Sequence, residues 1–106
     1  MPQPAELLAL MPFAVASGVA LDRAEPGEVT GRLPWAPDRC TAGGVLHGGA
    51  LMTLADSVGA VCAFLNLPAG TSTSTVASST ALMRAVRGGK AHAVPQVTQT
   101  QTVLKA

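Results

Sequence analysis

The chain has 106 residues, seven Lys and Arg against six Asp and Glu, and a formal net charge of +1 at pH 7. A chain of this length predicts a single domain, residues 1–106, that buries roughly 60–70% of its unfolded surface. The near-neutral charge gives no basis for nucleic-acid binding. Cys40 and Cys62 do not make a disulfide framework, and no basic segment precedes the N-terminal apolar residues, so we expect a cytoplasmic protein without a signal peptide.

The charges are unevenly placed along the chain. All six acidic residues lie at or before Asp56, whereas the basic residues after it are Arg84, Arg87, Lys90 and Lys105. A basic second half suits an anionic ligand such as a phosphorylated cofactor. A set of solvated surface cations is at least as good an interpretation.

The first third of the chain predicts a short helix followed by a β-hairpin. Residues 4–11 place a Pro near the start of a helix and apolar residues on one face. Pro12 weakens any continuation of this helix, and Gly18 ends the segment. Residues 19–23 and 29–35 are predicted strands. Between them, Pro26 and Gly27 are placed for a type II turn.

The most informative stretch runs from residue 43 to residue 65, GGVLHGGALMTLADSVGAVCAFL. Apolar residues recur at helical spacing, which predicts a helix over residues 48–66. Because this helix is apolar nearly all round, we expect it to be buried. Its polar residues form a second stripe, in which Asp56 is costly to bury unless something pairs with it or uses it. The length alone suits a membrane span, but the His, Thr, Asp and Ser residues argue against one.

The start of this helix has His47, Gly48 and Gly49 in place of the usual Ser, Thr, Asp or Asn cap. The first backbone N–H groups are therefore expected to be open to a ligand, and the helix dipole favours negative charge there. Gly49 and Asp56 are seven residues apart and share a face. One helix thus carries amide donors for an oxyanion together with a carboxylate.

Beyond the helix the sequence predicts further strands. Residues 71–80 are rich in Ser and Thr, and we interpret them as a strand that continues toward Arg84 rather than as a linker. Residues 90–94 begin another strand, Pro95 interrupts it, and residues 96–104 form the last. Strands in succession around one long helix predict an α+β domain with a mainly antiparallel sheet. The His and Cys residues show no metal-ligand spacing.

The segment GGVLHGGALMTLADSVGA, with STVASSTALMRAVRGGKAHAV and VTQTQTVL downstream, resembles the hotdog-fold acyl-CoA thioesterases of the phenylacetate-degradation (PaaI-like) group. The resemblance extends from Gly18 onward. Its most specific part is His-Gly-Gly with an acid nine residues after the His, here His47 and Asp56. It implies a hotdog fold, in which an antiparallel sheet wraps around one long central helix and two subunits form two active sites at their interface.

The resemblance also implies roles for single residues. The Gly48 amide would polarise the thioester carbonyl, and Asp56 of the partner subunit would act as general base or as nucleophile. His47 would orient the site, and Gly49 would contact the substrate. The alternatives are structural: His47 as an ordinary loop histidine, the glycines as a tight turn, and Asp56 as a capping or ion-paired carboxylate.

A hydroxyl early in the next strand, at Thr75 or Ser74, would help to hold the attacking water, although plain strand residues are the simpler interpretation. The phosphates of coenzyme A would meet Arg84, Arg87 and Lys90. No cofactor or metal is implied beyond the coenzyme A of the substrate itself. The expected partners are an acyl-CoA substrate and a second copy of the chain, as a homodimer or a dimer of dimers, with no nucleic acid and no membrane.

Two features depart from the family. Thr41 stands where many relatives have Asn or Gln, and the strand pair that usually precedes the last strand is missing before Gln96. Either the sheet is shortened, which would leave apolar helix surface uncovered, or a segment of the natural chain is absent at this point. The expected activity is hydrolysis of aryl- or medium-chain acyl-CoA. The alternative is a non-catalytic acyl-CoA-binding hotdog module, which both departures favour, and a hotdog hydratase or dehydratase is a third candidate.

Overall fold

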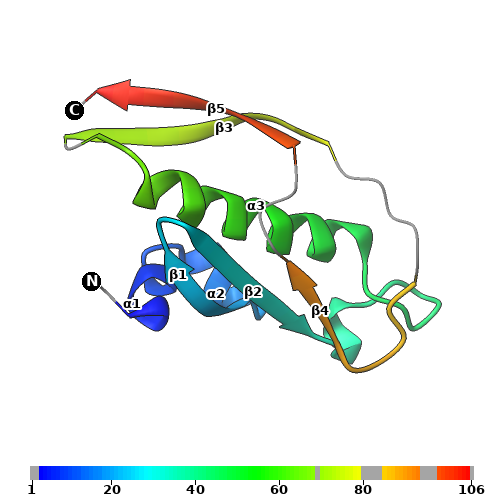
Figure 1. Ribbon diagram of the computed structural model, residues 1–106. Helices are drawn as coiled ribbons and strands as arrows, with labels where there is room; N and C mark the ends of the chain where they lie inside the picture. The colour runs from blue at the N-terminus through cyan, green and yellow to red at the C-terminus, as the bar shows by residue number, and fades with distance from the viewer. Residues whose placement is uncertain (1–2, 69, 80–84, 94–97, 106) are drawn as a thin grey trace.

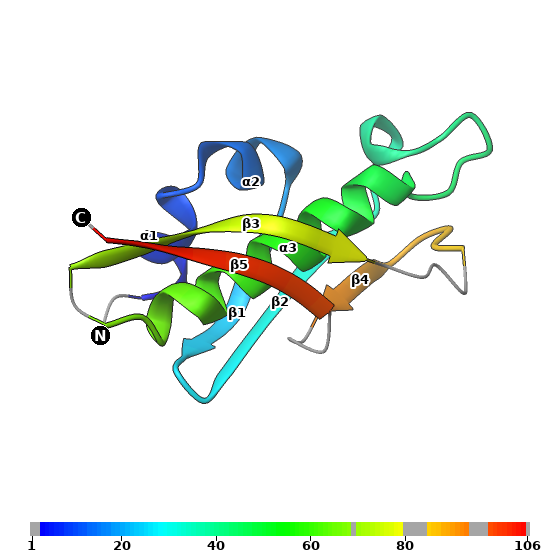
Figure 2. The same cartoon turned by 90° about the horizontal axis from the view of Figure 1, so that it is seen from above.

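The computed structural model describes residues 3–68, 70–79, 85–93 and 98–105. In these parts of the chain, two antiparallel sheets lie on opposite sides of one long helix, α3 (Figures 1 and 2). The elements in chain order are α1 (Pro4–Ala9), α2 (Pro12–Ser17), β1 (Ala20–Glu25), β2 (Glu28–Pro34), the 3₁₀ turn η1 (Pro37–Arg39), α3 (Gly48–Leu65), β3 (Thr71–Ser79), β4 (Lys90–Ala93) and β5 (Thr98–Lys105).

The N-terminal region holds two short helices where the sequence predicted one. α1 ends at Ala9, and α2 begins at Pro12, a residue that we expected only to weaken the helix. Proline suits the first position of a helix, because its fixed φ is already helical and its missing N–H has no partner to lose there. α2 ends at Gly18, whose φ of 91° lets its amide reach the carbonyls of Ala14 and Val15.

The predicted hairpin is confirmed. β1 and β2 pair antiparallel and close at Glu25 opposite Glu28, with Pro26 and Gly27 between them. The predicted type II turn is wrong, since that turn needs a positive φ at Gly27 and the glycines with positive φ do not include it.

The core lies between the hairpin and α3. Val29 and Leu33 of β2 are fully buried, as is Val58 of α3. Gly31 permits this close packing, because a Cβ there would stand 2.7 Å from a Val58 methyl carbon. The predicted helix is confirmed, but it is not buried all round: Met52 is 44% exposed and Phe64 is 50% exposed. By length and composition α3 also passes as a membrane span, a test that the core helix of a soluble protein passes equally.

The strands after α3 confirm the α+β prediction and show how the sheet is shortened. β3 pairs antiparallel with β5, whereas β4 pairs with β2, so that the described strands form two sheets in the orders β1-β2-β4 and β3-β5. Only residues 94–97 separate β4 from β5 along the chain, which leaves no length for a strand pair between them. The predicted continuation of β3 toward Arg84 lies outside the described residues.

Candidate active site

The loop before α3 is folded back on itself. Cys40 and Leu46 form an isolated antiparallel bridge, and the Thr41 N–H donates to the Val45 carbonyl across 2.9 Å. At its tip Gly44 adopts a φ of 76°, and its carbonyl accepts a 3.0 Å hydrogen bond from the Trp35 indole. Because Leu46 pairs with Cys40 in this loop, the next residue, His47, lies at the start of α3.

His47 caps the helix, contrary to the expectation of an uncapped start. Its backbone is extended, its N–H donates to the Arg39 carbonyl across 2.9 Å, and its Nδ1 accepts the Gly49 N–H across 2.8 Å. An accepting Nδ1 requires that the proton of the neutral ring sit on Nε2. In the part of the chain that the structure describes, the Gly48 N–H has no acceptor within hydrogen-bonding distance. Gly48, rather than Gly49, is therefore the donor that the start of α3 offers.

Thr53 lies one helical turn after Gly49 and binds the carbonyl of that glycine. Its hydroxyl donates to the Gly49 carbonyl across 2.8 Å. Both backbone groups of Gly49 are thus engaged within the chain, which leaves them poorly suited to the substrate contact expected of this residue.

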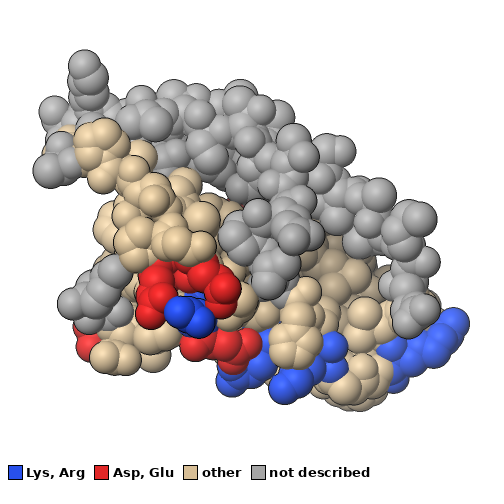
Figure 3. Space-filling model, in the orientation of Figure 1, with Lys and Arg blue, Asp and Glu red and all other residues tan. Residues whose placement is uncertain are grey.

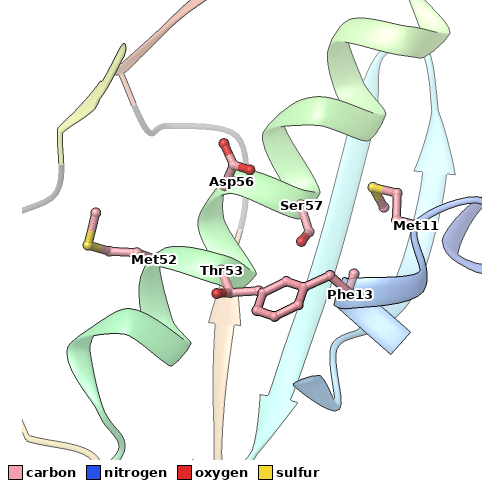
Figure 4. Close-up of a pocket in the computed structure, with 7 residues that line it drawn as sticks. Met11, Phe13, Met52, Thr53, Asp56 and Ser57 are labelled. Carbon is pink, nitrogen blue, oxygen red and sulfur yellow. The ribbon is translucent and has the colours of Figure 1, made fainter. Parts of the chain in front are cut away.

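Asp56 lies at an open groove of about 370 Å³ between α2 and α3. The carboxylate residue is half-buried, and Met11, Phe13 and Met52 supply apolar walls. Figure 4 shows the Phe13 ring reaching from α2 toward Thr53 on α3. Sequence patterns did not single out the apolar walls, because Met11 and Phe13 reach the groove only through tertiary packing.

A second groove, of about 520 Å³, lies at the start of α3. It is lined by His47 and Gly49, by Arg39 of the preceding turn, and again by Phe13 and Thr53. The two grooves share Phe13 and Thr53 and therefore adjoin along α3. His47 and Gly49 lie in the second groove and Asp56 in the first, whereas Gly48 lines neither.

Gly48 and Asp56 of one chain do not meet. Eight residues of helix separate them by roughly 12 Å along the axis and by about 80° around it. A general base has to lie within hydrogen-bonding reach of the water that attacks the carbonyl. One chain therefore cannot bring both groups to the same carbonyl carbon.

The basic residues predicted to bind the coenzyme A phosphates lie apart from the two grooves or outside the described part of the structure. Arg87 and Lys90 are exposed and line neither groove, although the Val86 carbonyl next to Arg87 accepts from the Leu46 N–H. In Figure 3, Lys and Arg atoms gather at the end where β4 begins, and Asp and Glu atoms gather over the β1–β2 hairpin. Arg84 is outside the described residues.

Thr75 and Ser74 lie on β3, where their backbones pair with Gln101 and Thr102 of β5. Their side chains are outside the described part of the structure. Among the described residues, no three His, Cys, Asp or Glu side chains form a group that could hold a metal ion.

A family model for the thioesterase superfamily matches residues 43–104, more than half of the chain. The chain belongs to this superfamily. The match includes the segment that begins α3 with His47 and carries Asp56, and superfamily membership supports thioester hydrolysis as the activity. We found no match to this sequence among curated proteins.

Solved structures share the fold of this chain. A mutant thioesterase from Pseudomonas aeruginosa superposes with a TM-score of 0.87 at 18% identity, covering 100% of this chain and 96% of that one. A conserved protein from the same organism has a TM-score of 0.78 at 25% identity, over 87% and 73% of the two chains. A phenylacetic acid degradation-related protein from Ralstonia eutropha has a TM-score of 0.67 at 21% identity, over 87% and 66%. The predicted hotdog fold and the family resemblance are thereby confirmed.

Proposed function

We propose that this chain hydrolyses acyl-CoA thioesters as a homodimer, with the Gly48 amide and Asp56 of the partner subunit acting on the same carbonyl. The observation that carries the proposal is the arrangement of α3. The helix opens on a Gly48 N–H that has no acceptor within the described residues, and two turns later it carries Asp56 at a groove. Membership of the thioesterase superfamily makes a thioester the natural substrate.

The chemistry follows from these two groups. The thioester carbonyl oxygen accepts the Gly48 N–H, and the positive end of the helix dipole stabilises the oxyanion that forms as water attacks. Asp56 takes the proton of that water. The tetrahedral intermediate then expels the coenzyme A thiolate, which is protonated, and the acyl group leaves as a carboxylic acid.

The separation of the two groups along α3 supports a composite site. Because roughly 12 Å of rigid helix keeps Gly48 away from Asp56 of its own chain, Asp56 can act at this amide only from a second copy. A two-fold axis makes the arrangement reciprocal, so that each dimer holds two equivalent sites.

The groove at Asp56 supports an aryl or medium-chain acyl group. Its volume of about 370 Å³ lies at the small end of the roughly 300–1,000 Å³ that is usual for ligand pockets. Its walls of Met11, Phe13 and Met52 suit an apolar group.

The first test is release of thiol from phenylacetyl-CoA and octanoyl-CoA. Asp56→Asn keeps the shape of the side chain and removes the base, so kcat/KM should fall by about 10²–10⁴. Asp22→Asn is the control, because Asp22 forms an ion pair with Arg32 on the hairpin, away from both grooves. Hydrolysis by Asp56→Asn at the wild-type rate would rule out the assigned role.

The second test asks whether the site is shared between subunits. Gly48→Pro removes the N–H donor but suits the first position of a helix, and the extended His47 before it suits a following proline. Alone, this variant should lose about 10²–10³ in rate. Mixed with Asp56→Asn in equal amounts and allowed to exchange subunits, it should recover about a quarter of wild-type activity, since half the dimers then hold one intact site. No recovery on proven subunit exchange would contradict a composite site.

Thr41 favours the non-catalytic alternative. Its hydroxyl accepts the Gly43 N–H across 3.3 Å inside the loop and so makes a local contact in place of the amide side chain of many relatives. In an acyl-CoA-binding module, wild-type protein would bind phenylacetyl-CoA tightly and release no thiol. This result would establish the binding module in place of the hydrolase.

A further inference from the structure

Arg39 is a cation at the second groove that the sequence did not single out. Its guanidinium donates from one Nη to the Pro34 carbonyl across 2.8 Å. It also lies against Gly18, where a Cβ would come within 2.3 Å of the guanidinium carbon. The missing side chain of Gly18 therefore makes room for the guanidinium, and the Pro34 carbonyl holds it in place at the wall of the groove.

The charge of this guanidinium is not balanced within the described part of the chain. The ion pairs found there engage Arg23 and Arg32, and none includes Arg39. Asp38 also lines the groove, but no ion pair joins it to Arg39. A guanidinium carries several N–H donors in a planar fork, and the described residues use only one of its nitrogens. The guanidinium is thus an unpaired cation with spare donors on a half-buried residue that lines the groove.

His47, which caps α3, lies next to Arg39 in the fold. The Arg39 carbonyl accepts the His47 N–H across 2.9 Å, and both residues line the second groove. The positive end of the α3 dipole adds to the same potential. Arg87 and Lys90, by contrast, are exposed and line neither groove.

We propose that Arg39 binds an anionic group of the substrate, either a phosphate of coenzyme A or a carboxylate on the acyl group. The inference rests on the proposed function in taking a thioester as the ligand. Planar, paired N–H donors suit both phosphate and carboxylate oxygens, and a guanidinium seated in advance loses little freedom on binding.

Three thioesters separate the two sources of negative charge. Phenylacetyl-CoA carries phosphates, succinyl-pantetheine carries only a carboxylate, and phenylacetyl-pantetheine carries neither. In Arg39→Gln we expect KM for the anionic substrate that Arg39 recognises to rise about 10- to 100-fold with kcat nearly unchanged. KM for phenylacetyl-pantetheine should stay within about twofold of wild type, because that substrate offers no anion.

A rise confined to phenylacetyl-CoA identifies a phosphate as the anion, and a rise confined to succinyl-pantetheine identifies a carboxylate. An equal loss on all three thioesters would overturn the inference, because it would mean that Arg39 only supports the loop that carries His47. Unchanged KM values on all three would overturn it as well. Arg23→Gln is the matched control: it removes the same charge from an exposed residue that pairs with Glu25 and Glu28, and it should leave every KM unchanged.

Arg39→Lys guards against a folding defect, since Arg39→Gln also loses the bond to the Pro34 carbonyl. It keeps the positive charge without the fork, and its KM should lie between wild type and Arg39→Gln. If wild-type protein releases no thiol from any thioester, the proposed function fails, and binding by calorimetry still decides the inference. It fails if neither coenzyme A nor succinyl-pantetheine binds Arg39→Gln more weakly than wild type.

Discussion

Replacing His47 by alanine removes the side-chain acceptor that caps α3, whereas replacing it by asparagine supplies another. The bond lost in His47→Ala is the 2.8 Å contact from the Gly49 N–H to Nδ1. Loss of such a cap costs about 1 kcal/mol of the free energy of unfolding. For a domain of this size, that lowers the melting temperature by roughly 3–6 °C. Asparagine is among the best capping residues, so His47→Asn should melt close to wild type.

Thermal unfolding followed by far-ultraviolet circular dichroism measures the difference. All three proteins are compared at one concentration, because the stability of an oligomer depends on concentration. Equal melting temperatures for His47→Ala and His47→Asn would refute a stabilising cap. Thiol release then separates the two roles of the residue. His47→Asn keeps the orientation of the Gly48 amide, so any activity that it loses is due to the imidazole itself.

Two further predictions concern the packing of β2 on α3. Gly31→Ala should lower the free energy of unfolding by about 1–3 kcal/mol, because the new Cβ would stand 2.7 Å from a Val58 methyl carbon. Gly27→Ala is the control. A Cβ at Gly27 would meet no atom within 4 Å, so the free energy of unfolding should change by less than about 0.5 kcal/mol. Leu33→Ala should cost about 2–5 kcal/mol, because Leu33 is fully buried, and Leu10→Ala, at 69% exposed, should be close to neutral. Urea denaturation measures all four, and equal stability within either pair would contradict this account of the core.

Much of the fold could be predicted because its signals are local. The apolar period of the segment after His47 predicted the central helix to within one residue, and alternation predicted the second hairpin strand. α2 was missed because Pro12 was interpreted only as a break, although a proline also starts helices. The turn type was wrong because Gly27 follows Pro26 as in a type II turn but keeps a negative φ.

The site was only partly predictable, for a physical reason. His47, Gly48 and Asp56 lie on one helix or directly before it, so spacing along the sequence relates them. The Arg39 guanidinium is held by Gly18 and by the Pro34 carbonyl, which belong to separate elements. A repeating sequence pattern cannot reveal contacts between residues of separate elements. The cap was missed because histidine is not among the preferred capping residues, even though a neutral imidazole has an acceptor nitrogen.

The rigidity of α3 makes assembly part of the proposed chemistry. No loop movement can shorten the distance between two positions on one helix, so only a second chain can bring Asp56 to the Gly48 amide. If a two-fold axis relates the chains, Gly48 of each meets Asp56 of the partner subunit only when the two helices cross antiparallel near the midpoint between these positions. That midpoint is Met52, which is apolar and 44% exposed in the single chain. A charge introduced there, as in Met52→Glu, would lie against its own symmetry copy and should therefore weaken the dimer. Sedimentation measures this loss separately from activity, which Met52→Glu also lowers because Met52 lines the groove at Asp56. An unchanged dimer would contradict the crossing at Met52.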